Sequence, residues 1–457
     1  MAPAAGIPLA ALVLFWFLPR LVHLRTMPFE VSPLLGFALS AALAGLLALF
    51  LEIHPFKGET VVSRQAEAWL TLGLGLAFYL VTVSFVSDRP GRLRISLAWI
   101  LAGLVVALLW SGVQAYFVLC CDGEIPYQVR QVHRLVSTRD PIGQRVTGLA
   151  FEPSWFAHQL NTLYFPICLA GLVTGGSVLR RRLLGISVEW VLLAGSIAAL
   201  GLSTSRIGLV GFIAIAGLAA TWLTVRTSMR LNRALQERIS RWLPGAVRVA
   251  RSLAIAFVWL GILVAFAAVT IGIVLVAARL DWRWERILAP PDVRIFSLEY
   301  ANYMLFSERA VYWTAAYRVF EGFPLLGVGL GNVGFFIPEV MPAFAWALPE
   351  VVEVLDPGTG LFPNAKSLWL RLLAETGVIG FSFFAVWLLL MAAGALRLSR
   401  NQDRLKRMVG AMGLFSLVAF VVEGFSVDSF AFPYFWVAMG LVTAAGRIAS
   451  ANAQRAL

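Results

Sequence analysis

The stretch LAIAFVWLGILVAFAAVTIGIVLVAA, from Leu253 to Ala278, contains no charged residue. It lies in an apolar run over residues 253–279, longer than the about 20 residues that a helix needs to cross a bilayer. Ten further apolar runs near that length can be drawn: 5–19, 31–52, 68–86, 95–119, 153–175, 186–203, 207–225, 377–396, 408–426 and 430–446. The sequence therefore predicts an all-α polytopic membrane protein with about eleven transmembrane helices, within a range of ten to twelve.

The composition excludes a water-soluble globular protein. Apolar residues make up 60% of the 457 residues and charged residues only 14%, and the mean hydropathy is +0.81. Cys120 and Cys121 are adjacent and Cys168 lies in an apolar run, so neither a disulfide framework nor a CxxC metal site is expected.

The first apolar run, 5–19, has no basic residues before it and no small-residue cleavage site after it. A removed signal peptide would carry both features. We therefore expect a retained membrane anchor.

Lys and Arg are unevenly distributed over the connecting segments. Twenty-two of the 37 lie in one set of alternate connections, at residues 20–25, 89–94, 180–182, 226–251, 397–407 and 447–455. Because basic residues collect on cytoplasmic loops, we assign this set to the cytoplasm. The net charge of +12 then reflects membrane topology, and no nucleic-acid partner is expected.

The outer side receives one long segment, residues 280–376. Structureless loops beyond about 15 residues are usually functional or disordered, and the many aromatic residues here argue against disorder. Within it, Ser307–Glu321 has the pattern of a helix capped by Ser307. The predicted domains are residues 1–279 with helices one to eight, the large helical loop 280–376, and residues 377–457 with the last three helices.

A glycine motif in this loop, Gly329-Leu-Gly331-Asn-Val-Gly334, matches GxGxxG. A dinucleotide site needs a preceding strand and a βαβ unit, which this pattern does not predict. We expect a tight turn whose glycines let backbone approach backbone or an anionic ligand. With four scattered histidines and no HxxxH or DxD pair, we predict neither a catalytic metal nor a cofactor.

Two arginines on the outer side are candidates for anion binding. Arg206 follows Ser205 at the outer junction of two apolar runs, where an ionisable residue is costly and indicates function. Arg309 lies on the predicted loop helix. Snorkelling of Arg206 to the interface, or pairing of Arg309 with Glu308, would be simpler explanations. Together, however, two guanidiniums suit a phosphate or diphosphate, which each binds through two parallel hydrogen bonds.

Glu152, in Phe-Glu-Pro-Ser-Trp, stands just before a predicted span. It is either a carboxylate favoured by the positive end of a helix or a general base. His158, further along, fits a buried packing residue better than a ligand.

Three stretches together resemble the O-antigen ligase and polymerase (Wzy-like) superfamily of bacterial polysaccharide assembly. The first is Ser203-Thr-Ser-Arg206 before an apolar run. The second holds Arg309, Trp313 and Pro324, then Gly327-Val-Gly-Leu-Gly-Asn332. The third is Ser367-Leu-Trp-Leu-Arg-Leu-Leu-Ala-Glu-Thr-Gly-Val-Ile-Gly380. Their order around a large outer loop late in a many-span chain carries the resemblance, which covers about residues 150–385.

The resemblance implies a GT-C type glycosyltransferase at the periplasmic face of the bacterial inner membrane. Its donor would be a glycan on undecaprenyl diphosphate, with Arg206 and Arg309 binding the diphosphate in place of a metal ion. Ligases of the family usually have His followed by Asn where this chain has Lys366 and Ser367, and that His is the proposed base. Lys366 would bind the diphosphate or, if strongly desolvated, act as a base. The base role moves toward Glu152, whose Glu-Pro-Ser setting resembles polysaccharide polymerases.

We therefore favour a polymerase that joins repeat units over a ligase that transfers a finished glycan to lipid A-core. A secondary transporter of an anionic substrate is the alternative of another class; the absence of visible repeats argues against it. The predicted catalytic residues are Glu152, Arg206, Arg309 and Lys366. The predicted substrate-binding residues are Ser205, Tyr312, Trp313, Asn332, Asn364 and Ser367. Expected partners are the lipid-linked oligosaccharide, membrane lipids and a chain-length regulator protein.

The predicted topology places Gly358 outside the cytoplasm. A Gly358→Cys variant should react with a membrane-impermeant maleimide in intact spheroplasts. Labelling only after lysis would reverse the assigned orientation.

Overall fold

The computed structural model describes residues 11–17, 19, 29–89, 91–179, 182–183, 186–239, 246–289, 292–294 and 297–456. This part of the chain is predominantly helical, which confirms the predicted all-α class. Its strands are β1 (Arg182–Leu183) and β2 (Ile186–Ser187), which pair antiparallel. Of the predicted first helix, residues 5–10 and 18 lie outside the described residues, and residues 11–17 are helical.

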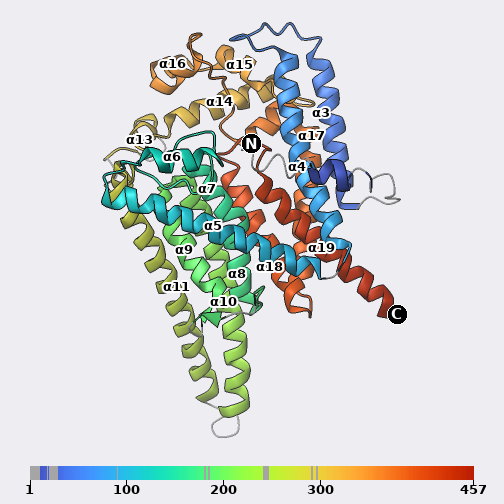
Figure 1. The fold of residues 1–457 in the computed structure, drawn as a ribbon, viewed down its shortest axis with the longest axis vertical. Helices are drawn as coiled ribbons and strands as arrows, with labels where there is room; N and C mark the ends of the chain where they lie inside the picture. The colour runs from blue at the N-terminus through green and yellow to red at the C-terminus, as the bar shows by residue number, and fades with distance from the viewer. Residues whose placement is uncertain are drawn as a thin grey trace. The chain divides into compact units, whose positions relative to one another are not determined.

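The helical elements follow one another along the chain (Figure 1). They are η1 (Val13–Phe17), η2 (Phe29–Val31), α3 (Ser32–Ala48), α4 (Val61–Ser87), α5 (Arg92–Cys120), α6 (Tyr127–Arg134), α7 (Pro153–Gln159), η3 (Leu160–Tyr164), α8 (Phe165–Thr174), α9 (Val188–Ser203), α10 (Arg206–Ile239), α11 (Ala246–Leu280), α12 (Trp282–Leu288), α13 (Leu298–Tyr303), α14 (Ser307–Gly322), α15 (Val333–Val340), η4 (Ala343–Ala347), α16 (Pro349–Leu355), α17 (Leu368–Ser399), α18 (Arg404–Glu423) and α19 (Pro433–Ala456).

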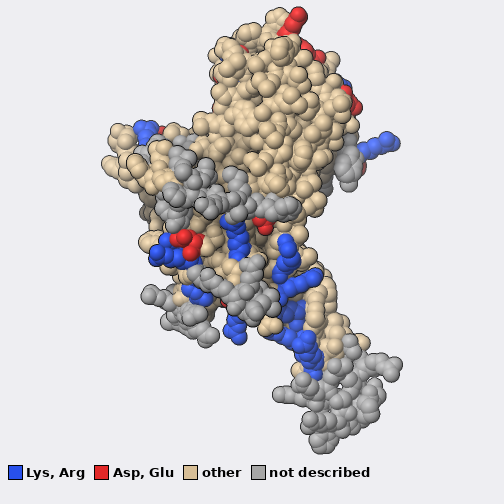
Figure 2. Space-filling view, turned by 90° about the vertical axis from the view of Figure 1, so that its right-hand side faces the viewer, with Lys and Arg blue, Asp and Glu red and all other residues tan. Residues whose placement is uncertain are grey.

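Each predicted span after the first coincides with helix. Among the described helices, α4, α5, α10, α11, α17 and α18 are long and apolar enough to cross a membrane, and α3 and α9 are shorter apolar helices. Apolar side chains also cover the outside of these helices. In the most apolar stretch of α11 only 11% of the residues are buried, and Phe257 and Leu263 are exposed. Figure 2 likewise shows a broad uncharged area on one face. The chain is a multi-pass membrane protein.

The chain packs as two compact units. Unit 1 comprises Met1–Leu93, Trp282–Arg397 and Phe420–Leu457, and unit 2 comprises Arg94–Asp281 and Leu398–Ala419. These units are defined by packing contacts, whereas the predicted domains follow the expected membrane topology. The predicted boundaries at residues 279/280 and 376/377 therefore stay a prediction.

In unit 1, α4 and α19 pack along their lengths. The Tyr79 hydroxyl lies 2.9 Å from Thr443 Oγ1. Trp436 is buried, donates a 3.0 Å hydrogen bond to the Phe430 carbonyl and stacks on Trp387 at 5.1 Å. Close approach is possible because Gly75 presents no side chain to this indole.

In unit 2, α10 and α11 run side by side (Figure 1). The broken helix α7–η3–α8 packs against α10, where Phe165 and Phe212 meet at 4.8 Å. The Asn161 amide donates a 2.6 Å hydrogen bond to the Gly208 carbonyl, which satisfies polar groups that have no water inside a membrane protein.

The part of unit 1 that contains α14, α15 and α16 has its own apolar core. Side chains of α14, α15 and α16 build it, including Val311, Ala315, Ile337 and Val351. α14 begins at Ser307, so the N-cap position belongs to Phe306, and the predicted Ser307 cap is wrong.

α17 is interrupted at Gly377, whose backbone is non-helical with φ +60°. The predicted span 377–396 starts at this break, and residues from Leu368 form a separate helical piece before it. The amides of Val378 and Ile379 donate to the carbonyls of Pro324 and Leu325 at 2.9 and 3.2 Å. The turn after α14 therefore replaces hydrogen bonds that the break removes.

Gly75 and Gly73 provide a matched test of the α4–α19 packing. Alanine in place of glycine adds about 1 kcal/mol of helix propensity at either position. A Cβ on Gly75 would overlap the Trp436 indole, whereas Gly73 faces open space, and overpacking costs about 1–3 kcal/mol. Gly75→Ala should lower the thermal unfolding midpoint in detergent and Gly73→Ala should not. Equal midpoints would contradict this packing.

Candidate active site

Three predicted site residues lie on α14, near its start. Tyr312 is fully buried, and Arg309 and Trp313 are half-buried. The Trp313 ring packs edge-on against Phe306 at 5.1 Å and meets Phe425 at 6.0 Å. Because residues three and four apart share a helix face, Arg309 lies on the same face of α14 as the Tyr312 and Trp313 rings.

Lys366 is held next to this face. Its ammonium lies 2.8 Å from Glu350 Oε1 and 5.4 Å from the centre of the Tyr312 ring. The Trp313 indole approaches the Lys366 carbonyl at 3.4 Å. The Lys366 backbone has φ +52°, a left-handed conformation that costs a non-glycine residue roughly 1–3 kcal/mol and recurs at functional sites.

Two carboxyl groups lie beside Lys366. The Glu350 amide donates to Glu308 Oε1 at 3.3 Å. Burial raises the pKa of Glu308, and the neighbouring Glu350 raises it further. Burial alone would raise the pKa of Glu350. Its hydrogen bonds with Glu308 and Lys366 outweigh this effect, so the pKa of Glu350 is lowered. The two shifts run in opposite directions, so Glu350 loses its proton more readily than Glu308.

Arg309 is fixed by the connection between α18 and α19. Its Nη1 donates to the Ser426 carbonyl at 3.2 Å. Burial lowers the pKa of Arg309, and the nearby Glu350, Asp428 and Glu308 act in the opposite direction. Since the ordinary pKa of arginine is above 12, the guanidinium remains charged. Burial also raises the pKa of the Tyr312 hydroxyl.

We call Glu308, Arg309, Tyr312, Glu350 and Lys366 the outer cluster, because all five lie in the segment that is predicted to be outside the cytoplasm. The two cations, Arg309 and Lys366, both act electrostatically on Glu350. In the ion pair with Glu350, the Lys366 side chain is 27% exposed and the Glu350 side chain 37%. An ion pair this exposed contributes only about 0–1 kcal/mol to stability. Its main effect is to hold the ammonium in place, where an incoming anion can compete with Glu350 for it.

The remaining predicted residues of unit 1 are bonded to the main chain. Ser367 is buried, and its hydroxyl donates to the Gly424 carbonyl at 3.2 Å. Asn332 is fully buried, and its amide donates to the Val328 carbonyl at 2.8 Å. Asn364 Oδ1 accepts from the Lys366 amide at 3.2 Å. Their roles in substrate binding stay predictions.

The glycine motif forms the expected tight turn. Gly327, Gly329 and Gly331 all have positive φ, between 72° and 86°. A Cβ on Gly327 or Gly331 would overlap backbone atoms of Glu375 or Arg64. The motif thus brings the turn against the main chain of α17 and α4, as glycine allows.

Arg206 and Ser205 lie in unit 2. Arg206 begins α10, two residues after Thr204, which has φ +48°. The Ser205 hydroxyl accepts from the Gly208 amide at 3.2 Å and so caps the first turn of the helix.

Glu152 also lies in unit 2, at the N-cap position of α7. Its Oε1 is 2.6 Å from Arg139 Nη1, and Oε2 accepts from the Ser154 hydroxyl at 3.2 Å. The carboxylate is thus oriented by two neighbours. Because Glu152 and Arg206 belong to unit 2 and Arg309 and Lys366 to unit 1, the diphosphate clamp and the base stay predictions.

Sequence reasoning missed Glu350 and Asp428 as neighbours of the predicted residues. Glu350 is in the outer segment but far from Lys366 along the chain, and no local pattern links the two. Asp428 carried a usable signal, since it is the acidic residue in the short polar connection between the runs 408–426 and 430–446. Topology alone would have placed it on the outer side.

A comparison with protein families finds one match relevant to these residues. Residues 191–385 match the family model described as O-antigen ligase. No curated protein matches the chain. The matched region contains all three motifs of the sequence, with Arg206, Arg309 and Lys366, whereas Glu152 lies before it. Over residues 191–385 the chain is therefore similar to the O-antigen ligase family, in agreement with the resemblance that the three motifs carry.

Proposed function

We propose that the chain is a glycosyltransferase that joins undecaprenyl-diphosphate-linked oligosaccharide repeat units at the periplasmic face of the bacterial inner membrane. The observation that carries the proposal is a family match whose region contains the outer cluster, with Arg309 and Lys366 both acting on Glu350. The transfer is proposed to need no metal ion, because fixed cations can stabilise the charge of a leaving diphosphate.

In this proposal the cationic side chains bind the lipid-linked donor. Arg309 and Lys366 bind diphosphate oxygens, with Arg206 as the second guanidinium. A diphosphate carries more negative charge than Glu350 and displaces this carboxylate from Lys366. As the anomeric carbon–oxygen bond breaks, the departing diphosphate gains charge, and these contacts strengthen.

The acceptor side needs a base. The acceptor hydroxyl attacks the anomeric carbon, a new carbon–oxygen bond forms, and the hydroxyl proton passes to a carboxylate. An ammonium already paired with Glu350 at 2.8 Å is suited to bind phosphate rather than to accept a proton. Glu152, oriented by Arg139 and Ser154, is the proposed base.

A ligase is the second candidate, because the family model itself is described as O-antigen ligase. The two activities differ in the acceptor: a polymerase uses another lipid-linked repeat unit, and a ligase uses lipid A-core. The replacement of His-Asn by Lys366-Ser367 favours the polymerase.

Arg309→Lys tests the diphosphate contact. An ammonium cannot reproduce two parallel guanidinium hydrogen bonds, and a charge-assisted hydrogen bond contributes about 1.5–3 kcal/mol. We expect kcat/KM for the lipid-linked donor to fall about tenfold to hundredfold with unchanged expression. Arg318→Lys is the matched control, because Arg318 is an exposed residue of the same helix. Equal activities of the two variants would remove Arg309 from the site.

Glu152→Gln and Lys366→Ala separate the base from the donor contact. General-base help is worth about 10²–10⁴ in rate, so Glu152→Gln should lose turnover by that factor at unchanged donor KM. Lys366→Ala should mainly raise the donor KM. The exposed Glu124→Gln controls for loss of a carboxylate.

The product distinguishes polymerase from ligase in the same assay. Wild-type protein supplied only with lipid-linked repeat units should yield a ladder spaced by one unit in mass spectra. If no ladder forms until lipid A-core is added, and Lys366→Ala instead of Glu152→Gln abolishes transfer, the ligase replaces the polymerase.

A further inference from the structure

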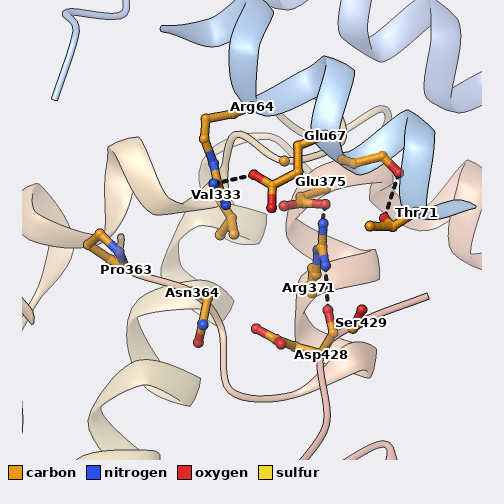
Figure 3. A pocket seen from close by; sticks show the side chains of 12 residues that line it. Arg64, Glu67, Thr71, Val333, Pro363, Asn364, Arg371, Glu375, Asp428 and Ser429 are labelled. Carbon is orange, nitrogen blue, oxygen red and sulfur yellow. Dashed lines mark hydrogen bonds and ion pairs between the residues drawn. The ribbon is translucent and has the colours of Figure 1, made fainter. Parts of the chain in front are cut away.

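A polar cavity of about 170 Å³ lies in unit 1, next to the outer cluster. It is enclosed by the start of α4, the glycine turn, the segment before α17, α17 itself and the connection between α18 and α19 (Figure 3). At about 30 Å³ per water molecule, it has room for roughly six waters, which is the order of size of one sugar ring.

The deep wall of the cavity is built from fixed charges. Arg371 stands between Glu375 and Asp428 (Figure 3). Its Nε donates to Glu375 Oε2 at 3.0 Å, and Nη1 donates to the Asp428 carbonyl. The Arg371 side chain is 15% exposed and that of Glu375 only 1%. Such a wall offers a ligand groups that are already oriented.

Two polar atoms at the cavity have unmet hydrogen-bonding capacity. Asp428 Oδ2 and Arg64 Nε are both buried, and neither has a hydrogen-bond partner among the residues that the structure describes. Buried polar atoms are rarely left without partners. Arg64 and Asp428 both line the cavity, so it offers one donor group and one acceptor group, which suits a ligand that both accepts and donates hydrogen bonds.

The charge of the lining selects the kind of ligand. Two arginines, Arg64 and Arg371, face three carboxylates, Glu67, Glu375 and Asp428. With this excess of negative charge, a further carboxylate or phosphate would be repelled. Hydroxyl, amino and acylamino groups, which donate hydrogen bonds, are favoured.

The cavity is also connected to the outer cluster. Asp428 lines it and acts electrostatically on Arg309. Asn364 lines it and accepts from the Lys366 amide. In a lipid-linked glycan the first sugar is bonded directly to the diphosphate, so a diphosphate on Arg309 and Lys366 would bring a sugar close to this cavity.

We infer that the cavity binds one sugar residue without an acidic group, a neutral or acylamino sugar, of the lipid-linked glycan. The inference rests on the proposed function for the source of this sugar. It adds a sugar subsite, and a preference against uronic acids, to the diphosphate contact.

Thr71→Leu tests the subsite, because Thr71 lines the cavity and leucine is larger and apolar. Binding is measured for the full chain in lipid nanodiscs, with a polyprenyl diphosphate bearing no sugar, one N-acetylhexosamine or one hexuronic acid. In wild-type protein the N-acetylhexosamine should tighten binding about tenfold over the bare lipid, the effect of one or two hydrogen bonds. Thr71→Leu should abolish this gain and leave the bare-lipid affinity unchanged.

Thr221→Leu is the matched control, since Thr221 is exposed and, like Thr71, bonds back to a carbonyl one turn earlier. It should keep the gain. A gain that survives in Thr71→Leu, or that is missing in wild-type protein, overturns the subsite.

A second variant keeps the test independent of any misfolding of Thr71→Leu. Asp428→Asn removes one negative charge from the lining, so the ratio of hexuronic acid to N-acetylhexosamine lipid affinity should rise about tenfold. The ratio cancels any effect on the diphosphate. Glu353→Gln, an exposed carboxylate of α16, should leave the ratio unchanged. An unchanged ratio in Asp428→Asn overturns the preference.

The bare lipid separates the two proposals. If it does not bind wild-type protein, the diphosphate contact of the proposed function fails. Free N-acetylglucosamine, followed by saturation-transfer NMR in wild-type protein and Thr71→Leu, then decides the cavity alone: a signal lost in the variant supports it, and equal signals overturn it.

Discussion

The connection from Gly424 to Asp428 is the part of unit 1 on which the outer cluster and the cavity both depend. Its carbonyl oxygens receive hydrogen bonds from separate elements: the Leu368 amide reaches Gly424 and Val427 at 2.7 and 2.8 Å, Arg309 reaches Ser426, and Arg371 reaches Asp428. A carbonyl group without a hydrogen-bond donor costs free energy in apolar surroundings. The positions of these donors are therefore tied to the positions of the carbonyl groups. α14 and α17 are thereby held to one short stretch of main chain.

This arrangement gathers charged side chains around one short connection of unit 1. Each charged side chain in it has another charged group or a carbonyl as neighbour, and the ion pair of Arg371 and Glu375 is more buried than that of Lys366 and Glu350. The first pair therefore forms a fixed wall of the cavity. The second pair is accessible to a ligand, which is the property expected of a binding group.

The helices were predictable because apolar length is a local property of the sequence. The run that contains Leu253–Ala278 became α11, and the predicted loop helix became α14. In the sequence, the break at Gly377 appears only as the start of an apolar run. The carbonyls that accept hydrogen bonds from the amides after the break belong to Pro324 and Leu325, which are distant in the sequence. The pairing of Lys366 with Glu350, and the approach of Asp428, depend on how distant segments pack. No periodicity or motif encodes such contacts, so candidate residues were predictable singly and their grouping was not.

The exposed apolar surface of α11 links the protein to the thickness of its membrane. Its apolar part, Ser252–Leu280, has 29 residues and at 1.5 Å per residue is about 44 Å long. The hydrocarbon core of a bilayer is about 30 Å thick. Because little of this helix is covered by protein, the mismatch must be absorbed by tilt or by local thickening of the lipid. The acyl-chain length of the surrounding lipids thus acts directly on the orientation of this helix.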